Sequence, residues 1–179
     1  MQIAPEHLVN VALWSIEISQ DFVRHHPDQE GIASLTFHIS TENPQTLAKY
    51  YPIIRNIAGF AHLSLHYDDT TENLGTGLPV IVAVGKSGRE EIVDAIRNMA
   101  EDGVNPLEVD EKKIEQYLTF QHLPDYVIKT GGSHLVDFLI WQSVYSELIF
   151  LDLNWPAIRK VDLLRAFRDY QSRARRFGT

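Results

Sequence analysis

The sequence predicts an α/β fold, a single domain in which a mostly parallel central sheet is flanked by helices. Short apolar segments typical of buried strands alternate along the chain with segments whose apolar residues recur at helical spacing. The 179 residues correspond to one domain, and 44% of them are hydrophobic, which is enough to fill a core. No repeat, linker or low-complexity tract divides the chain, so we expect one layered domain over residues 1–179.

Two helices are expected in the first third of the chain. Pro5 suits a helix start, and the apolar face behind it continues to about Arg24. Asn43 is expected to cap a second helix that has proline at its first position. Pro52 should kink or shorten that helix, because proline lacks the N–H that an interior helical position donates.

Buried strands are predicted for three segments of the first half: Ile32–Ile39, Ala61–Tyr67 and Leu78–Val84. The last is the best candidate for the centre of the sheet, and the polar residues 68–77 before it read as a turn. His62 and His66 share one face of the second strand. They would lie about 13 Å apart, too far to share a metal ion, so we expect exposed or hydrogen-bonded histidines.

The second half opens with the clearest local signal in the chain. Ser87 and Glu90 form a capping box, which marks a helix start. One apolar face of that helix is expected to comprise Ile92, Ala95, Ile96, Met99 and Ala100. Asp110 caps a shorter helix that ends at Leu118. The remaining elements are a strand at Asp125–Lys129, a short helix beyond a glycine loop, a strand at Glu147–Leu153 and a last helix from about Lys160.

Charge is unevenly distributed along the chain. The formal net charge of −8 argues against a nucleic-acid partner. Seven of the sixteen basic residues nevertheless lie between Arg159 and Arg176, so this end carries about +5 and the rest about −13. One interpretation of this run is a solvated helix face with a basic last turn, which the helix dipole favours.

The composition also bears on location. Zero cysteines exclude disulfides and thiolate metal sites and fit a reducing compartment. No apolar run approaches the roughly 20 residues that span a bilayer, and residues 1–10 lack a signal-peptide pattern. We therefore expect a cytoplasmic protein that meets a membrane only peripherally.

The segment "VIKTGGSHLVDFLIWQ" (Val127–Gln142) carries the most suggestive chemistry. Four residues at the end of its strand could receive an anion: Lys129, Gly131, Gly132 and Ser133. The lysine adds charge, the serine adds a hydroxyl, and the glycines let backbone N–H groups approach a ligand. A tight strand-to-helix turn is the alternative explanation of the same residues.

Five segments occur in the order, and nearly at the spacing, of a known family: "IKTGGS", "FLIWQ", "YSELIF", "NWP" and "RARRFG". With them, residues 124–178 resemble the C-terminal half of the cis-prenyltransferase (undecaprenyl diphosphate synthase-like) family. Upstream, "GIASLTFHISTEN" and "VIVAVGKSGREEIVDAI" resemble two further stretches of that family. The resemblance implies a Mg²⁺-dependent transfer that elongates an allylic diphosphate with isopentenyl diphosphate.

The departures from the family pattern imply lost activity. The family's N-terminal strand and its D-G-N-G-R-W loop, whose Asp holds Mg²⁺, have no counterpart in this sequence. Lys129 replaces the arginine of the glycine loop, and Leu135–Asp137 replaces an R-x-S step that binds diphosphate. Glu147 matches the second metal-contacting position, and an ion pair or an interface bond is the alternative role for a single carboxylate without its partner. Because each lost charge-stabilising contact can lower the rate by roughly 10²–10³, we expect little activity from this chain alone.

The same losses resemble the Nogo-B receptor-like, non-catalytic subunit of heteromeric cis-prenyltransferases. That subunit lacks D-G-N-G-R-W and keeps a C-terminal R-x-G, which Arg176, Phe177 and Gly178 match. The resemblance implies that Arg176 and Gly178 enter the site of a D-G-N-G-R-W partner and bind diphosphate there. Lys129 and the residues after Thr130 would be a second diphosphate loop, with Mg²⁺ held mainly by the partner.

Two other functions stay open. The chain could be a diverged homodimeric prenyltransferase that uses Lys129, Glu147 and Arg176 on its own substrates. It could also be a non-enzymatic binding or scaffold module of the same fold. Since family interfaces are large and hydrophobic, an isolated subunit is also expected to pair with itself.

Overall fold

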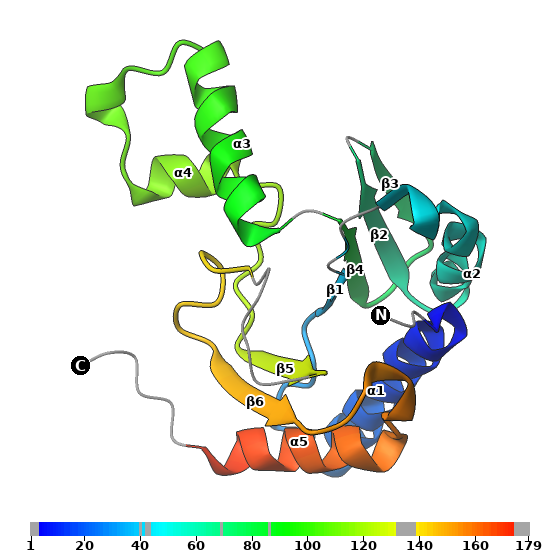
Figure 1. The fold of residues 1–179 in the computed structure, drawn as a ribbon. Coiled ribbons are helices and arrows are strands. Elements are labelled where there is room, and N and C mark those ends of the chain that lie inside the picture. Colours follow the sequence, from blue (N-terminus) through cyan, green and yellow to red (C-terminus); the bar gives the residue numbers. More distant parts are fainter. Residues whose placement is uncertain are drawn as a thin grey trace.

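The computed structural model describes residues 4–39, 41, 44–68, 70–85, 87–131 and 139–173 (Figure 1). Within these residues, four strands form a sheet of order β1-β4-β2-β3: β1 (Leu35–Ile39), β2 (His62–Tyr67), β3 (Thr70–Leu74) and β4 (Pro79–Val84). A second sheet pairs β5 (Tyr126–Thr130) with β6 (Glu147–Leu151). Every pairing is parallel except that of β2 with β3. The α/β fold with a mostly parallel sheet is confirmed.

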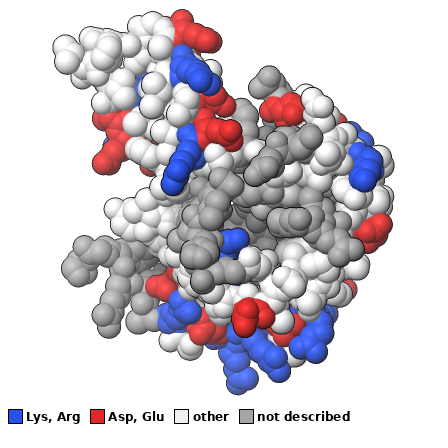
Figure 2. Space-filling view, in the orientation of Figure 1, with Lys and Arg blue, Asp and Glu red and all other residues white. Residues whose placement is uncertain are grey.

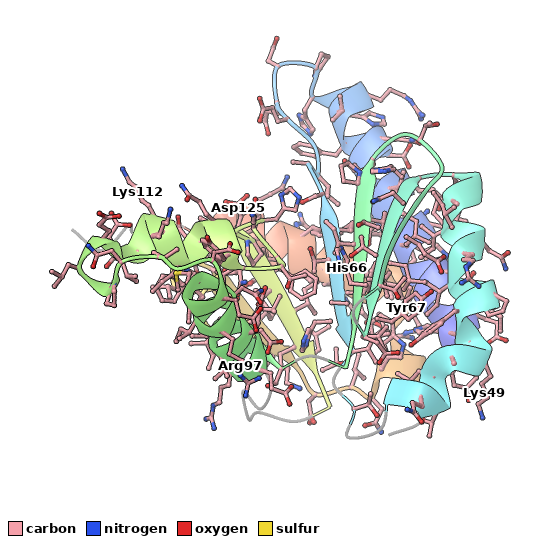
Figure 3. The ribbon with its side chains drawn as sticks, turned by 90° about the horizontal axis from the view of Figure 1, so that it is seen from above. Lys49, His66, Tyr67, Arg97, Lys112 and Asp125 are labelled. Carbon is pink, nitrogen blue, oxygen red and sulfur yellow. The ribbon has the colours of Figure 1, made fainter. Side chains whose placement is uncertain are left out.

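Helices precede β1, lie between β1 and β2 and between β4 and β5, and follow β6. The α-helices are α1 (Pro5–His25), α2 (Tyr51–Ile54), α3 (Gly88–Glu101), α4 (Glu111–Tyr117) and α5 (Lys160–Ser172). Four 3₁₀ segments accompany them: η1 (Pro44–Tyr50), η2 (Arg55–Gly59), η3 (Pro106–Glu108) and η4 (Trp155–Ala157). Viewed from above, α3 with Arg97 and α4 with Lys112 lie on one side of β2, and Lys49 lies on the other (Figure 3).

β4 is the central strand, as its sequence predicts, because it pairs with both β1 and β2. Its side chains alternate between two cores. Val80, Val82 and Val84 pack in the larger core, with residues of α1 and α2. Ile81 and Ala83 pack on the other face of the sheet with Phe120 and Leu139. The strand is therefore buried on both faces, which explains its continuous apolar sequence.

α1 and α5 lie side by side and join the two sheets (Figure 1). Leu163 of α5 packs with Val11 and Ile18 of α1, and this cluster also contacts Phe37 of β1 and Ile128 of β5. The two predicted helices are confirmed at nearly their expected bounds. The basic end of the chain is thereby held against the body of the fold.

The sequence analysis was wrong about residues 68–77. β3 occupies Thr70–Leu74 and forms an antiparallel hairpin with β2. Its polar side chains suit an edge strand that faces solvent on one side. Arg55 holds the strand through two hydrogen bonds to Glu72, of 2.8 and 2.7 Å. The Tyr67 hydroxyl donates to the same carboxylate at 2.5 Å.

Other differences concern the ends and faces of elements. β1 begins at Leu35, three residues after its predicted start. The predicted helix at residues 44–54 is mostly 3₁₀, and its α-helical turn begins beside Pro52; Asn43 lies outside the described residues. The capping box of α3 is confirmed, and so is the Asp110 cap of α4. On α3, however, Ile96 is 52% exposed, so its apolar face is only partly covered.

Candidate functional site

The glycine loop begins where the sequence analysis expected it, at the carboxyl end of β5. Gly131 has φ of +73°, a left-handed conformation that favours glycine, and its N–H donates to the Leu153 carbonyl at 3.0 Å. The Lys129 ammonium donates to the Thr130 carbonyl at 3.2 Å. Gly132 and Ser133 lie outside the described residues. The described part is thus a bend at Gly131 with the Lys129 ammonium nearby.

Glu147 lies at the other end of the same sheet. It is the first residue of β6 and stands opposite Tyr126, the first residue of β5. Lys129 is three residues further along β5, a separation of about 10 Å along the strand. Glu147 therefore lies at the opposite end of this sheet from Lys129 and Gly131, with which the sequence analysis grouped it.

Glu147 takes part in an ionic cluster with the end of α5. The Arg173 guanidinium donates to the Glu147 carboxylate at 3.1 Å, to the Leu148 carbonyl at 3.1 Å and to the Asp169 carboxylate at 2.7 Å. The Tyr126 hydroxyl donates to the Ala166 carbonyl at 2.9 Å. Burial, followed by the nearby Asp169 carboxylate, raises the pKa of Tyr126 to about 12.

The described residues do not assemble a magnesium site around Glu147. Mg²⁺ requires several oxygen ligands in octahedral geometry. Among the residues that the structure describes, no group of three or more His, Asp or Glu side chains could hold a metal ion. Glu147 could contribute one oxygen, yet its carboxylate already accepts from Arg173. A complete site would need ligands from elsewhere.

Several large apolar side chains on β6 or near it in the sequence are exposed. They are Leu123, Ile140, Val144, Tyr145 and Phe150, and we call them together the β6 surface. Val144 and Tyr145 are 66% and 74% exposed and directly precede the 146–151 segment. Aromatic side chains such as Tyr145 and Phe150 are enriched at protein–protein contacts.

Most described basic side chains of α5 are ion-paired. Figure 2 shows Lys and Arg side chains along the edge formed by α5. Arg159 and Arg165 both pair with Asp162, and Lys160 pairs with Glu17 at 2.7 Å. These pairs agree with the solvated-helix interpretation for residues 159–172. Arg176 and Gly178 lie outside the described residues, so their predicted role stays a prediction.

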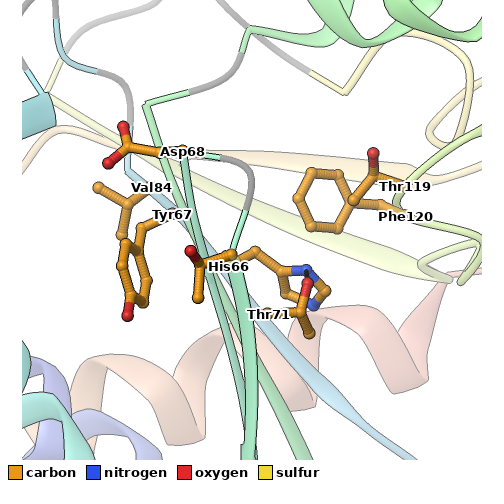
Figure 4. A pocket seen from close by; sticks show the side chains of 8 residues that line it. His66, Tyr67, Asp68, Thr71, Val84, Thr119 and Phe120 are labelled. Carbon is orange, nitrogen blue, oxygen red and sulfur yellow. Dashed lines mark hydrogen bonds between the residues drawn. The ribbon is translucent and has the colours of Figure 1, made fainter.

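A hollow that the sequence analysis did not predict lies at the carboxyl ends of β2 and β4. Its volume is about 160 Å³, and its lining includes His66, Tyr67, Asp68, Thr71 and Phe120 (Figure 4). His66 contacts the Ser64 hydroxyl at 2.9 Å and the Thr71 hydroxyl at 3.0 Å, which confirms a hydrogen-bonded histidine. Burial lowers the pKa of His66.

A partly buried aromatic cluster also escaped the sequence analysis. His7 of α1 makes edge-on ring contacts with Trp14 and Trp155. Its Nε2 atom is buried and has no hydrogen-bond partner among the described residues. Burial lowers the pKa of His7, which outweighs the opposing effect of a backbone hydrogen bond to Trp155. In the sequence, only the position of His7 on the apolar side of α1 could have indicated this aromatic cluster.

No helix among the described residues is long and apolar enough to cross a membrane.

This α/β fold places the chain in a class of proteins that includes known relatives. Residues 60–178 match the family described as "undecaprenyl diphosphate synthase". Because this match covers more than half of the sequence, the chain belongs to that cis-prenyltransferase family.

Individual relatives agree with this assignment. A tritrans,polycis-undecaprenyl-diphosphate synthase (geranylgeranyl-diphosphate specific) of Methanopyrus kandleri is 48% identical over 104 residues, covering 54% of this chain and 38% of its own length. Isoprenyl transferase 1 of Corynebacterium diphtheriae is 42% identical over 137 residues, covering 65% and 52%. The chain thus spans about half or less of the length of these relatives.

A solved structure supports the fold. Lavandulyl diphosphate synthase from Lavandula x intermedia, in complex with dimethylallyl diphosphate, superposes with a TM-score of 0.70. The match covers 97% of this chain and 87% of the other, at 24% identity. This similarity bears on the fold alone.

Proposed function

We propose that the chain is the non-catalytic subunit of a heteromeric cis-prenyltransferase. Its partner would carry D-G-N-G-R-W, and the complex would make a polyprenyl diphosphate for a glycosyl carrier lipid. One observation supports this most directly. α5 ends at Arg173, beside Glu147 and at the opposite end of β5 and β6 from Lys129 and Gly131. The residues that follow Arg173 therefore start away from this chain's own Lys129, which supports a role toward a neighbouring molecule.

Chain length limits where the R-x-G motif can go. Arg176 lies three residues beyond Arg173, so its Cα is within about 11 Å of the Cα of Arg173. Val144 and Tyr145 of the β6 surface directly precede β6 near Glu147, which accepts a hydrogen bond from Arg173. A partner docked on that surface would therefore bring its own site within reach of Arg176.

The β6 surface also has the chemistry of a subunit contact. Tyr145, Val144 and Phe150 offer apolar area, and aromatic side chains are frequent energetic centres of interfaces. The neighbouring ion pair of Glu147 and Arg173 is about one third exposed and could take part in polar contacts at the rim. An isolated chain could cover the surface with a second copy of itself.

In the complex, this chain would bind and neutralise phosphate. The Arg176 guanidinium can donate two parallel hydrogen bonds to a phosphate, and the Gly178 N–H can add a third. Mg²⁺ held mainly by the partner would stabilise the diphosphate charge that develops as the allylic carbon–oxygen bond breaks. The new carbon–carbon bond forms to isopentenyl diphosphate, which then loses a proton. Lys129 and residues 131–133 would form a second, retained diphosphate loop.

A second candidate is a prenyltransferase that is active alone. The identity of 48% to a chain named as a synthase and of 42% to a chain named as an isoprenyl transferase favours it. The residues of the candidate site oppose it, because Lys129, Glu147 and Arg176 provide few of the contacts that ionisation of a diphosphate requires.

Incorporation of radiolabelled isopentenyl diphosphate separates the candidates. The purified chain, a D-G-N-G-R-W protein that lacks R-x-G, and their mixture are each supplied with Mg²⁺ and an allylic diphosphate. We expect label in product only from the mixture. Activity of the chain alone would establish the second candidate, and no activity in any sample would favour a scaffold role.

A further inference from the structure

We propose that Arg173 is a positioning residue that fixes where the C-terminal segment leaves α5 and so sets the reach of Arg176. The inference rests on the proposed function, in which Arg176 acts in a partner's site. It assigns a role to a residue that is outside the R-x-G motif and that the sequence pattern alone does not distinguish from the other arginines of this region.

Arg173 is anchored to two separate elements. Its Nη1 atom donates to Glu147 at 3.1 Å and to the Leu148 carbonyl at 3.1 Å, which ties it to β6. Its Nε atom donates to Asp169 at 2.7 Å, which ties it to the last turn of α5. No other described arginine on α5 bonds to a strand: Arg159 and Arg165 pair within the helix region.

The backbone at Arg173 ends the helix. Its ψ of 134° is extended, and its N–H donates to the Tyr170 carbonyl at 3.1 Å. The chain therefore changes direction at this residue, and the side chain holds the same residue against β6. Residue 173 therefore has a fixed position, and Arg176 follows it by three positions in the sequence.

The contacts of Arg173 hold its side chain in place more firmly than a fully exposed ion pair would. The Arg173 side chain is 32% exposed and Glu147 is 31% exposed, so the pair is partly desolvated. The guanidinium reaches three acceptors because its donors form a planar fork, which an ammonium cannot reproduce. On this account Glu147 serves mainly to hold Arg173, which also explains why it stands apart from the glycine loop.

A double-mutant cycle tests the positioning role in the reconstituted complex. The variants are Arg173→Gln, Arg176→Ala and the pair together, with Arg168→Gln as the matched control because Arg168 is exposed on the same helix. Misplacing a substrate-binding group by about 1 Å can lower turnover up to about 10²-fold. We expect Arg173→Gln to lower turnover at least about tenfold without weakening assembly, and Arg168→Gln to have no effect.

The cycle distinguishes positioning from general stability. If Arg173 acts through Arg176, the double variant should be no slower than Arg176→Ala alone. Arg173→Lys should restore only part of the turnover, because an ammonium lacks the planar fork of donors with which the guanidinium reaches β6 and Asp169. Multiplicative losses in the double variant, or no loss for Arg173→Gln, would overturn the inference. No loss for Arg176→Ala would instead overturn the proposed function.

A second measurement does not need activity. ¹⁵N–¹H heteronuclear NOEs of Phe177 and Gly178 report backbone motion on the picosecond to nanosecond timescale in the full chain. We expect Arg173→Gln to lower these NOEs and to leave that of Leu163 in α5 unchanged. Equal NOEs in the two proteins would refute the anchor, even if the mixture of subunits incorporated no label.

Discussion

Removal of the Glu91 carboxylate should strongly destabilise the protein. Glu91 lies in the first turn of α3 and is 2% exposed. It accepts a hydrogen bond from the Phe120 N–H at 2.7 Å and another from the Gln142 side chain at 2.9 Å. Gln142 also donates to the Phe120 carbonyl at 2.8 Å. One carboxylate therefore joins α3 to the segments that precede and follow β5.

The size of the effect follows from these contacts. A hydrogen bond to a charged group contributes about 1.5–3 kcal/mol, and Glu91→Ala removes two of them. The mutant no longer has to desolvate a carboxylate, which offsets part of the loss. A net destabilisation of about 3 kcal/mol is expected, which corresponds to a fall in Tm of about 6–12 °C for a chain of this size.

Thermal and urea denaturation of Glu91→Ala, Glu91→Gln and Glu101→Ala provide the test. The amide of Glu91→Gln can still accept from the Phe120 N–H, so its loss should be nearer about 1 kcal/mol. Glu101 is exposed near the end of the same helix, and its replacement should change stability by less than about 0.5 kcal/mol. A change for Glu91→Ala as small as that of Glu101→Ala would refute the reasoning.

Three further predictions concern pH and backbone conformation. Burial lowers the pKa of both His7 and His66. Their contribution to stability is therefore present above about pH 6.5 and is lost as the pH falls through their folded pKa values. The urea midpoint should be lower at pH 5.5 than at pH 7.5, and His66→Gln should reduce this difference. The pKa of Glu72 is lowered to about 2, chiefly by its hydrogen bond from Arg55. Stability from this pair is therefore lost as the pH falls from about 4.5 toward 2. Glu72→Gln should make stability less dependent on pH in that window, and an unchanged pH dependence would contradict this role of Glu72. Gly131→Ala should destabilise the protein by about 1–2 kcal/mol because φ at this residue is +73°. The described residues leave space for the added methyl group, so the cost comes from the backbone conformation. An unchanged urea midpoint would show that the backbone relaxes at this residue.

Local sequence signals predicted much of the fold. The capping box at Ser87 and the apolar run of β4 depend on neighbouring residues and on burial, both of which leave a pattern in the sequence. β3 left no such pattern. Its stability depends on pairing with β2 and on the contact between Arg55 and Glu72, residues 17 positions apart in the chain. Long-range pairing of a polar edge strand is invisible to local propensity.

The candidate site was predictable as a set of residues and not as an arrangement. Lys129 and Glu147 were identified by type and motif, but their separation to opposite ends of one sheet depends on the register of β5 with β6. The role of Arg173 depends on a contact with a strand 26 residues earlier in the sequence. Such register and tertiary contacts are set by packing of the whole domain, so motif spacing could not supply them.

The most direct test of the account is the effect of Arg176→Ala on a mixture of this chain and its D-G-N-G-R-W partner. Assembly is followed by native mass spectrometry, and turnover by incorporation of isopentenyl diphosphate. The account predicts unchanged assembly with turnover lowered by about 10²-fold, because one charge-stabilising contact is removed from the partner's site. Unchanged turnover in a fully assembled mixture would contradict the claim that this chain completes that site.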